Sequence, residues 1–215
     1  QDAITAMRPY AEKLTELLQN LSATLDGDVG GEFTTQREVK NVLLVAITSN
    51  RGLCGAFNAN VIKAIKSRTD FYAGKNVDVY AIGKKGNDGL AKTCTITDNK
   101  SNVFDNLTFE NVADIADDLT LKFLSGQYDR IELVYNQFKN AATQIVITEQ
   151  FLPLTPIETK SSSTTVDYIY EPKKEEILLN LIPKSLKTQL YKAIRDSFAS
   201  EHGARMTAMH KATDN

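Results

Sequence analysis

Apolar residues recur at alternating steps of three and four along the first 25 residues of the chain. This spacing is typical of a helix that presents one apolar seam to a partner helix in a coiled coil. Polar side chains fill the other faces, and Pro9 predicts a kink or a late helix start. The seam comprises Ile4, Met7, Ala11, Leu14, Leu18, Leu21 and Leu25. We predict an N-terminal helix over residues 1–26, paired with another helix or, alternatively, lying on a core.

A second helical pattern, at the other end of the chain, supplies a partner for that helix. Beyond Pro183, apolar residues spaced four apart give way to small residues at the same spacing, which let two helix axes approach closely. The rows are Leu186, Leu190, Ile194 and Phe198, then Ser200, Ala204, Ala208 and Ala212. We predict a helix over residues 171–215 that pairs with the first as an antiparallel coiled coil. Because the chain opens inside one pattern and stops inside the other without a C-cap glycine, we expect both helices to be truncated.

Strands and helices alternate in the middle of the chain, over residues 39–160. An apolar, β-branched run at residues 41–48 is typical of a strand that is covered on both faces. We predict further strands at residues 77–82, 94–97, 130–138 and 143–151, the last two joined as a hairpin, and helices at residues 58–72 and 110–124. This alternation predicts an α/β fold, a Rossmann-like layered sheet domain inserted between the two long terminal helices.

Composition and charge narrow the classes of function. The chain has 25 Lys and Arg residues against 27 Asp and Glu residues, a net charge of −2, which argues against a basic nucleic-acid-binding surface. Two cysteines form neither a disulfide framework nor a Cys-rich zinc site. The longest apolar run, residues 42–47, is far shorter than the roughly 20 residues that span a bilayer. We expect a soluble protein of a reducing compartment, with no nucleic-acid partner and no direct membrane insertion.

The most distinctive segment of the domain is a glycine-containing turn at residues 49–58, between a predicted strand and a predicted helix. Doubly wound folds bind phosphates at such places. The turn holds only half of a dinucleotide fingerprint, however, and the Gly-x-x-x-x-Gly-Lys-Ser/Thr phosphate loop occurs nowhere in the chain. A small nucleotide-binding domain stays open as an alternative to a tight structural turn around a small buried thiol.

Cys54 in this turn is the candidate nucleophile of a second alternative, a Cys-dependent hydrolase. The nucleophile-elbow pattern Gly-x-Cys-x-Gly fails at Ala56, and a thiolate needs a base, whereas both histidines lie on the terminal helix. His202 and His210 are eight residues apart, while metal-binding histidine pairs on a helix are closer in sequence. We therefore predict no metal site and no cofactor.

Two pairs of charged residues have ordinary structural interpretations. Glu201 and Arg205 stand at positions i and i+4 of the predicted terminal helix, which favours a surface ion pair. Lys84 and Lys85 stand between glycines and predict an exposed turn that closes the second strand.

Two segments resemble the gamma subunit family of F-type ATP synthase. Residues 49–58, SNRGLCGAFN, resemble the family's SDRGLCGGFN stretch, and residues 200–215 resemble its C-terminal helix motif more closely still. Residues 167–172 and 7–10 are also similar to the family, so the resemblance covers essentially the whole chain apart from the family's outer helix ends. The departures are Asn50 for Asp, Ala56 for Gly, Gly203 for Ala, and His210 at a variable position. Gly203 places a weak helix former inside the predicted helix.

The resemblance implies a central-stalk rotor subunit that is not itself catalytic, since ATP chemistry in this family takes place in the beta subunits. Its paired terminal helices would form a shaft inside the ring of alpha and beta subunits. Its α/β domain would sit against the epsilon subunit and the membrane c ring, at the cytoplasmic face of a bacterial plasma membrane or its organellar equivalent. The resemblance assigns partner contacts to Glu201, Arg205, Met206 and Met209 in the shaft and to Tyr168, Tyr170 and Glu171 at the foot.

Overall fold

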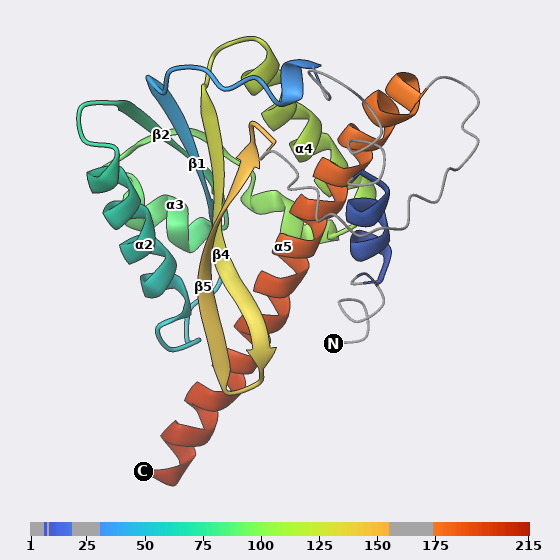
Figure 1. Cartoon of the computed structure of the whole chain (residues 1–215). Helices are drawn as coiled ribbons and strands as arrows, with labels where there is room; N and C mark the ends of the chain where they lie inside the picture. The colour runs from blue at the N-terminus through green and yellow to red at the C-terminus, as the bar shows by residue number, and fades with distance from the viewer. Residues whose placement is uncertain (1–6, 8, 19–30, 155–173) are drawn as a thin grey trace.

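A five-stranded sheet forms the middle layer of the protein in the computed structural model, which describes residues 7, 9–18, 31–154 and 174–215 (Figure 1). The strands run in the order β3-β2-β1-β4-β5. β1 pairs in parallel with β2 and β4, β2 pairs in parallel with β3, and β5 runs antiparallel to β4. Their bounds are Asn41–Ile47 for β1, Asn76–Ile82 for β2, Thr95–Asn99 for β3, Arg130–Asn140 for β4 and Thr143–Leu152 for β5. The predicted α/β sheet is confirmed.

Helices cover both faces of this sheet (Figure 1). In β1, Val42 and Leu44 point to one face and pack with α2, while Leu43 and Val45 point to the other and pack with α4 and α5. The alternation follows from the period of two in a strand. The helices are α2 (Phe57–Phe71) and α3 (Lys84–Leu90) on one face, and α4 (Phe109–Leu124) and α5 (Lys174–Asp214) on the other, with short 3-10 turns at Gly31–Phe33 and Ser101–Asn106.

The helix α3 corrects one sequence-based expectation. Lys84 and Lys85, predicted to lie in an exposed turn, form the first turn of this helix. Its sequence, KKGNDGL, contains weak helix formers and no apolar period, so no local signal marked it. The helix is held in place by tertiary contact instead, because the Gly86 N–H donates to Thr48 Oγ1 at 2.8 Å, at the end of β1.

The long helix α5 has a role that its spacing alone did not reveal. It runs through Pro183 without ending, and its row Leu178, Ile182, Leu186, Leu190 and Ile194 is buried in the same core cluster as residues of β4 and α4. Strands that are apolar on both faces need a cover on each, and α5 supplies part of one. The row predicted to face another helix therefore packs largely on the domain itself.

The N-terminal helix is described over residues 9–18, and Leu18 joins the core cluster that contains Leu178 and Ile182 of α5. The rest of the predicted helix pairing falls on residues 1–6, 8 and 19–30, outside the described residues. Within the described parts of the chain, no helix combines the length and the apolar character that crossing a membrane requires.

Candidate functional site

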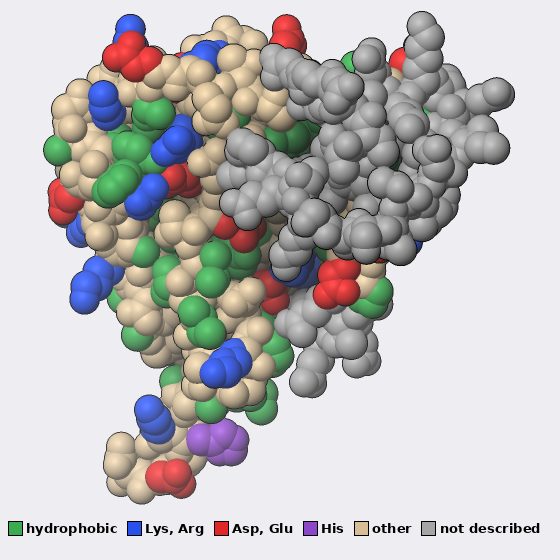
Figure 2. Space-filling model, viewed as in Figure 1, with side chains coloured by type: hydrophobic (Ala, Val, Ile, Leu, Met, Phe, Trp, Pro, Cys, Tyr) green, Lys and Arg blue, Asp and Glu red, His purple; other side chains and the backbone are tan. Residues whose placement is uncertain are grey.

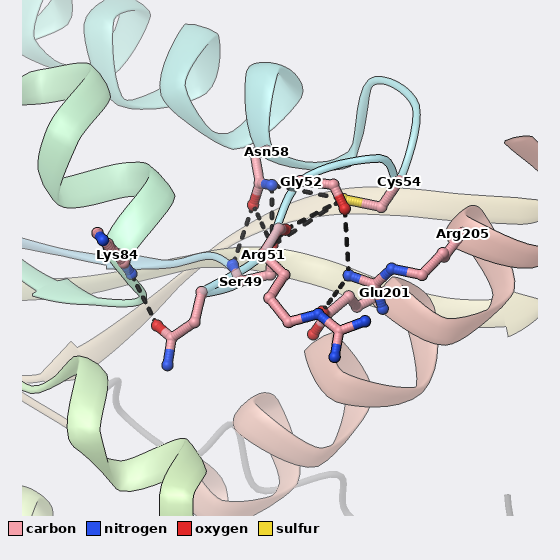
Figure 3. Close-up of polar contacts among 9 residues, drawn as sticks. Ser49, Arg51, Gly52, Cys54, Asn58, Lys84, Glu201 and Arg205 are labelled. Carbon is pink, nitrogen blue, oxygen red and sulfur yellow. Dashed lines mark hydrogen bonds and ion pairs between the residues drawn. The ribbon is translucent and has the colours of Figure 1, made fainter.

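The two segments that stand out in the sequence meet in space. The turn at residues 49–58 links β1 to α2 and lies against the part of α5 that carries Glu201 and Arg205 (Figure 3). Arg205 Nη2 donates to the Gly52 carbonyl at 3.4 Å across 153 positions of sequence. Beside this contact, Ala204 packs in a small buried cluster with Cys54 and Phe57. The fold thus joins the glycine turn and the terminal helix into one site.

Side chains at the two ends of the turn hold it closed. Ser49 N–H donates to Asn58 Oδ1 at 2.9 Å, and Asn58 Nδ2 donates back to Ser49 Oγ at 2.8 Å. Ser49 Oγ in turn donates to the Arg51 carbonyl at 2.6 Å. Because these polar groups satisfy one another around the buried Ser49, they favour one conformation of the turn.

Asn50 ties the turn to two neighbouring elements. Its Oδ1 accepts from the Lys84 N–H at 2.9 Å at the start of α3, and its Nδ2 donates to the Ser101 carbonyl at 2.9 Å. An amide side chain accepts and donates at once, whereas an ionised carboxylate only accepts. The substitution of Asn for the Asp expected from the resemblance therefore adds the contact to Ser101.

Leu53 at the tip of the turn is both strained and exposed. Its φ is 60°, a left-handed conformation that is costly for a side chain with a Cβ, and the residue is 86% exposed. Strained backbone persists where surrounding structure enforces it, and such positions cluster at functional sites. The turn thus presents a leucine to solvent, next to the exposed Arg51.

Glu201 and Arg205 form the predicted ion pair, but not on an open surface. Their Oε1 and Nη2 atoms are 2.7 Å apart, and each side chain is only 11% exposed. Arg205 Nη2 is shared between this carboxylate and the Gly52 carbonyl. The pair thus fixes the turn against α5, and the predicted contact of these two residues with other subunits stays a prediction.

A cavity of about 420 Å³ opens beside the ion pair. Its lining brings Arg51 and Arg205 together with Asp105 and Glu201, so the charges nearly balance. Nucleotide phosphates favour backbone N–H cradles and an excess of positive charge, so the cavity does not favour the nucleotide-binding alternative. The aromatic part of the lining includes Phe198, whose ring meets the His202 ring edge to face with centroids 4.6 Å apart.

The environment of Cys54 does not suit a nucleophile. The residue is 2% exposed, and its Sγ accepts from Asn58 Nδ2 at 3.4 Å and contacts Ser49 Oγ and the Arg51 carbonyl. None of these three neighbours is a base that would generate the thiolate. Across the described parts of the chain, no group of three His, Cys, Asp or Glu residues could hold a metal ion.

The remaining predicted contact residues divide between two places. Met206 and Met209 lie in the last turns of α5, where they are 56% and 54% exposed. Tyr168, Tyr170 and Glu171 lie outside the described residues. Sequence reasoning did not single out Leu53 or Asn58 individually; an apolar residue between two glycines was the one signal for Leu53.

Comparison with protein families and curated relatives supports the resemblance. A family model described as ATP synthase matches residues 1–215. The ATP synthase gamma chains of Flavobacterium johnsoniae and Flavobacterium psychrophilum are each 79% identical to this chain over 215 residues. The gamma chain of Christiangramia forsetii is 61% identical over 216 residues. Each of these alignments covers 100% of this chain and 75% of the relative.

Solved structures support the fold. A chain of the central stalk and c ring of the Tetrahymena thermophila mitochondrial ATP synthase superposes with a TM-score of 0.63 at 23% identity, covering 98% of this chain and 99% of that one. A rotor chain of the Euglena gracilis mitochondrial ATP synthase superposes with a TM-score of 0.61 at 18% identity, covering 100% of this chain and 89% of that one.

Proposed function

This chain belongs to the family of ATP synthase gamma chains, the central-stalk rotor subunits, and we propose that it couples rotation of the membrane c ring to conformational change in the catalytic beta subunits. The observation that carries the proposal is the 79% identity to curated gamma chains over the whole chain. The subunit itself is not catalytic, and ATP is made or hydrolysed in beta.

The architecture suits a part that carries work between distant sites. One charge that crosses the membrane supplies roughly 2.3 kcal/mol per 100 mV, so several crossings must be accumulated for each nucleotide made. α5 is one helix of 41 residues that begins as a layer of the α/β domain and ends as an exposed projection (Figure 1). A helix anchored in this way transmits torque by favouring one beta conformation at each angle, a difference in affinity between states.

The proposed partners follow from the two ends of the molecule. The alpha and beta subunits surround the projecting end of α5, where Met206 and Met209 are exposed and pack in the shaft. The foot, with Tyr168, Tyr170 and Glu171, contacts the epsilon subunit and the c ring. The complex lies at the cytoplasmic face of a bacterial plasma membrane, and this subunit is peripheral to it.

The test is reconstitution of the rotary complex. The full-length chain is mixed with alpha and beta subunits from the same source, and the rate of ATP hydrolysis is recorded. We expect cooperative hydrolysis that depends on this chain, together with ATP-driven ion pumping once the membrane sector is added. A chain that neither joins the complex nor changes the hydrolysis rate contradicts the proposal.

A further inference from the structure

The helix α5 and the β4–β5 hairpin touch backbone to backbone. A Cβ atom added at Gly203 would lie 2.7 Å from the Ala141 carbonyl oxygen and 3.0 Å from Ala141 Cα, in the hairpin turn. Real Cβ atoms essentially never come as close as 2.7 Å to another heavy atom, so the missing side chain is what admits the hairpin. The alanine expected at this position from the family resemblance has no room here.

Two side chains on the same face of α5 extend this contact. Ser200 Oγ donates to the Asn136 carbonyl of β4 at 3.2 Å. The Thr207 hydroxyl lies within hydrogen-bond distance of two carbonyls, that of Ala141 at 3.3 Å and that of Gly203 in its own helix at 3.0 Å, which share its one proton. Positions 200, 203 and 207 lie on one face because residues three, four and seven apart are neighbours along a helix. The hairpin therefore follows α5 over two helical turns.

The glycine turn holds the neighbouring face of α5. Arg205 donates to the Gly52 carbonyl, and Ala204 packs against Cys54. Among the described residues, these contacts and the hairpin are the last that α5 makes before it projects, since residues 209–215 are exposed and the helix continues past the hairpin (Figure 1). Helix and domain are thus joined from two sides at one level.

We propose that the tip of the β4–β5 hairpin braces α5 where it leaves the domain, and that Gly203 is the positioning residue that seats the brace. The inference rests on the proposed rotor function. A glycine is the most easily bent position of a helix, because it has the largest backbone freedom. In a helix that carries torque, this position would lie just below the projecting end. The hairpin opposes bending at Gly203 by occupying the space that a side chain would fill.

The experiment measures ions pumped per ATP hydrolysed in the assembled complex, with Gly203→Ala in the full-length chain. The matched control is Gly89→Ala in α3, where the added Cβ meets only the side chain of Ile62 and is nearest to Cδ1, at its flexible end. A third variant, Thr207→Val, keeps the side-chain volume and removes the hydroxyl that reaches the Ala141 carbonyl of the hairpin and the Gly203 carbonyl of α5. We expect the ratio to fall about twofold or more in Gly203→Ala, the lower end of what single positions contribute to coupling, and to stay unchanged in Gly89→Ala.

Each outcome has one meaning. A lowered ratio in Gly203→Ala, with a smaller fall in Thr207→Val, supports the brace. A ratio equal to that of the wild type overturns it. If the Gly203→Ala chain fails to assemble, Thr207→Val decides: a lowered ratio supports the brace and an unchanged ratio overturns it. A wild-type complex that does not couple at all rejects the rotor function instead, so the two failures are distinguishable.

Discussion

Arg205 joins two segments that the sequence presents as separate motifs. Its guanidinium donates both to Glu201 and to the Gly52 carbonyl, and the two charged side chains are largely out of contact with water. The planar fork of arginine serves two acceptors at once, which the single ammonium of lysine does less well. At the residue scale, the polar groups of the site satisfy one another's hydrogen bonds. The removal of any one of them leaves another without its partner.

We predict that Arg205→Ala destabilises the chain by about 2 kcal/mol, because it leaves the Glu201 carboxylate buried without its partner and Gly52 without a donor. Arg205→Lys should cost less, since it keeps the charge. The measurement is urea unfolding of the 215-residue chain, with Lys63→Ala on the exposed face of α2 as the control. In the full complex Arg205→Ala should also weaken coupling; unchanged ATP-driven pumping would remove this residue from the coupling path.

At the scale of elements, α3 shows how packing replaces local propensity. Gly83, with φ of 128°, directs the chain from β2 into the helix, and a Cβ there would lie 2.6 Å from the Thr48 backbone. Gly83 and Gly86 together let α3 abut the end of β1. The helix forms because the glycines permit this approach, although glycines ordinarily disfavour helices.

We predict that Gly83→Ala destabilises the chain by about 2–4 kcal/mol, because the new Cβ both strains the backbone and clashes with Thr48. Gly89→Ala, in the same helix, should change the unfolding free energy far less. Chemical denaturation of both variants makes the comparison. Equal losses for the two would show that the contact with Thr48 contributes nothing.

Besides Tyr72, which donates to Glu132, three tyrosine hydroxyls link elements of the sheet layers through carboxylates. Tyr80 donates to Asp118 of α4 at 2.9 Å, and Tyr135 donates to Glu149 of β5 at 3.0 Å. The third hydroxyl, that of Tyr128, donates to Asp78 at 2.8 Å. Burial first, and then the neighbouring carboxylate, raises the pKa of each phenol above its ordinary value of 10.0.

A raised pKa in the folded state implies a loss of stability at high pH. The unfolded chain loses these phenolic protons near pH 10 while the folded chain keeps them, so their contribution is complete below that pH and declines above it. We predict that the unfolding free energy falls between about pH 9 and about pH 11, and less steeply in Tyr135→Phe. Tyr10→Phe, at a half-exposed position, is the control. The same pH slope in wild type and Tyr135→Phe would contradict the assignment.

At the scale of the whole molecule, one helix serves both stability and function. The buried row of α5 covers the sheet, and its last turns project beyond the body of the domain (Figure 1). Acidic and basic side chains are interspersed on the described part of the face shown in Figure 2. The molecule thus consists of a folded α/β domain and a helix end that projects from it, and the two parts meet at residues 200–207.

We predict that the 215-residue chain cut after Ala208 keeps its unfolding free energy within about 0.5 kcal/mol, because residues 209–215 are all exposed. The same truncation should abolish ATP-driven pumping in the complex, because it removes the projecting end of α5. Denaturation and pumping are measured on the same preparation. A large loss of stability would show that the end of α5 packs on the α/β domain.

Local patterns were sufficient to predict most elements and the family. The buried run of β1, the hairpin of β4 and β5 and the apolar period of α4 are each visible in the sequence, because periodicity reports which faces of a segment are apolar. The motifs at residues 49–58 and 200–215 identified the family from the sequence alone. The assignments of Tyr168, Tyr170 and Glu171 stay predictions.

Only the tertiary structure decided what each apolar or small face packs against. Periodicity predicts a face and not its partner, so the row of α5 that suggested a second helix packs on β4 and α4. The helix α3 depends on its contact with Thr48, and the site depends on a contact between residues 153 positions apart. A short window of sequence contains neither pair of residues. Gly203, a weak helix former in the sequence, is in the fold the place where the hairpin backbone fits.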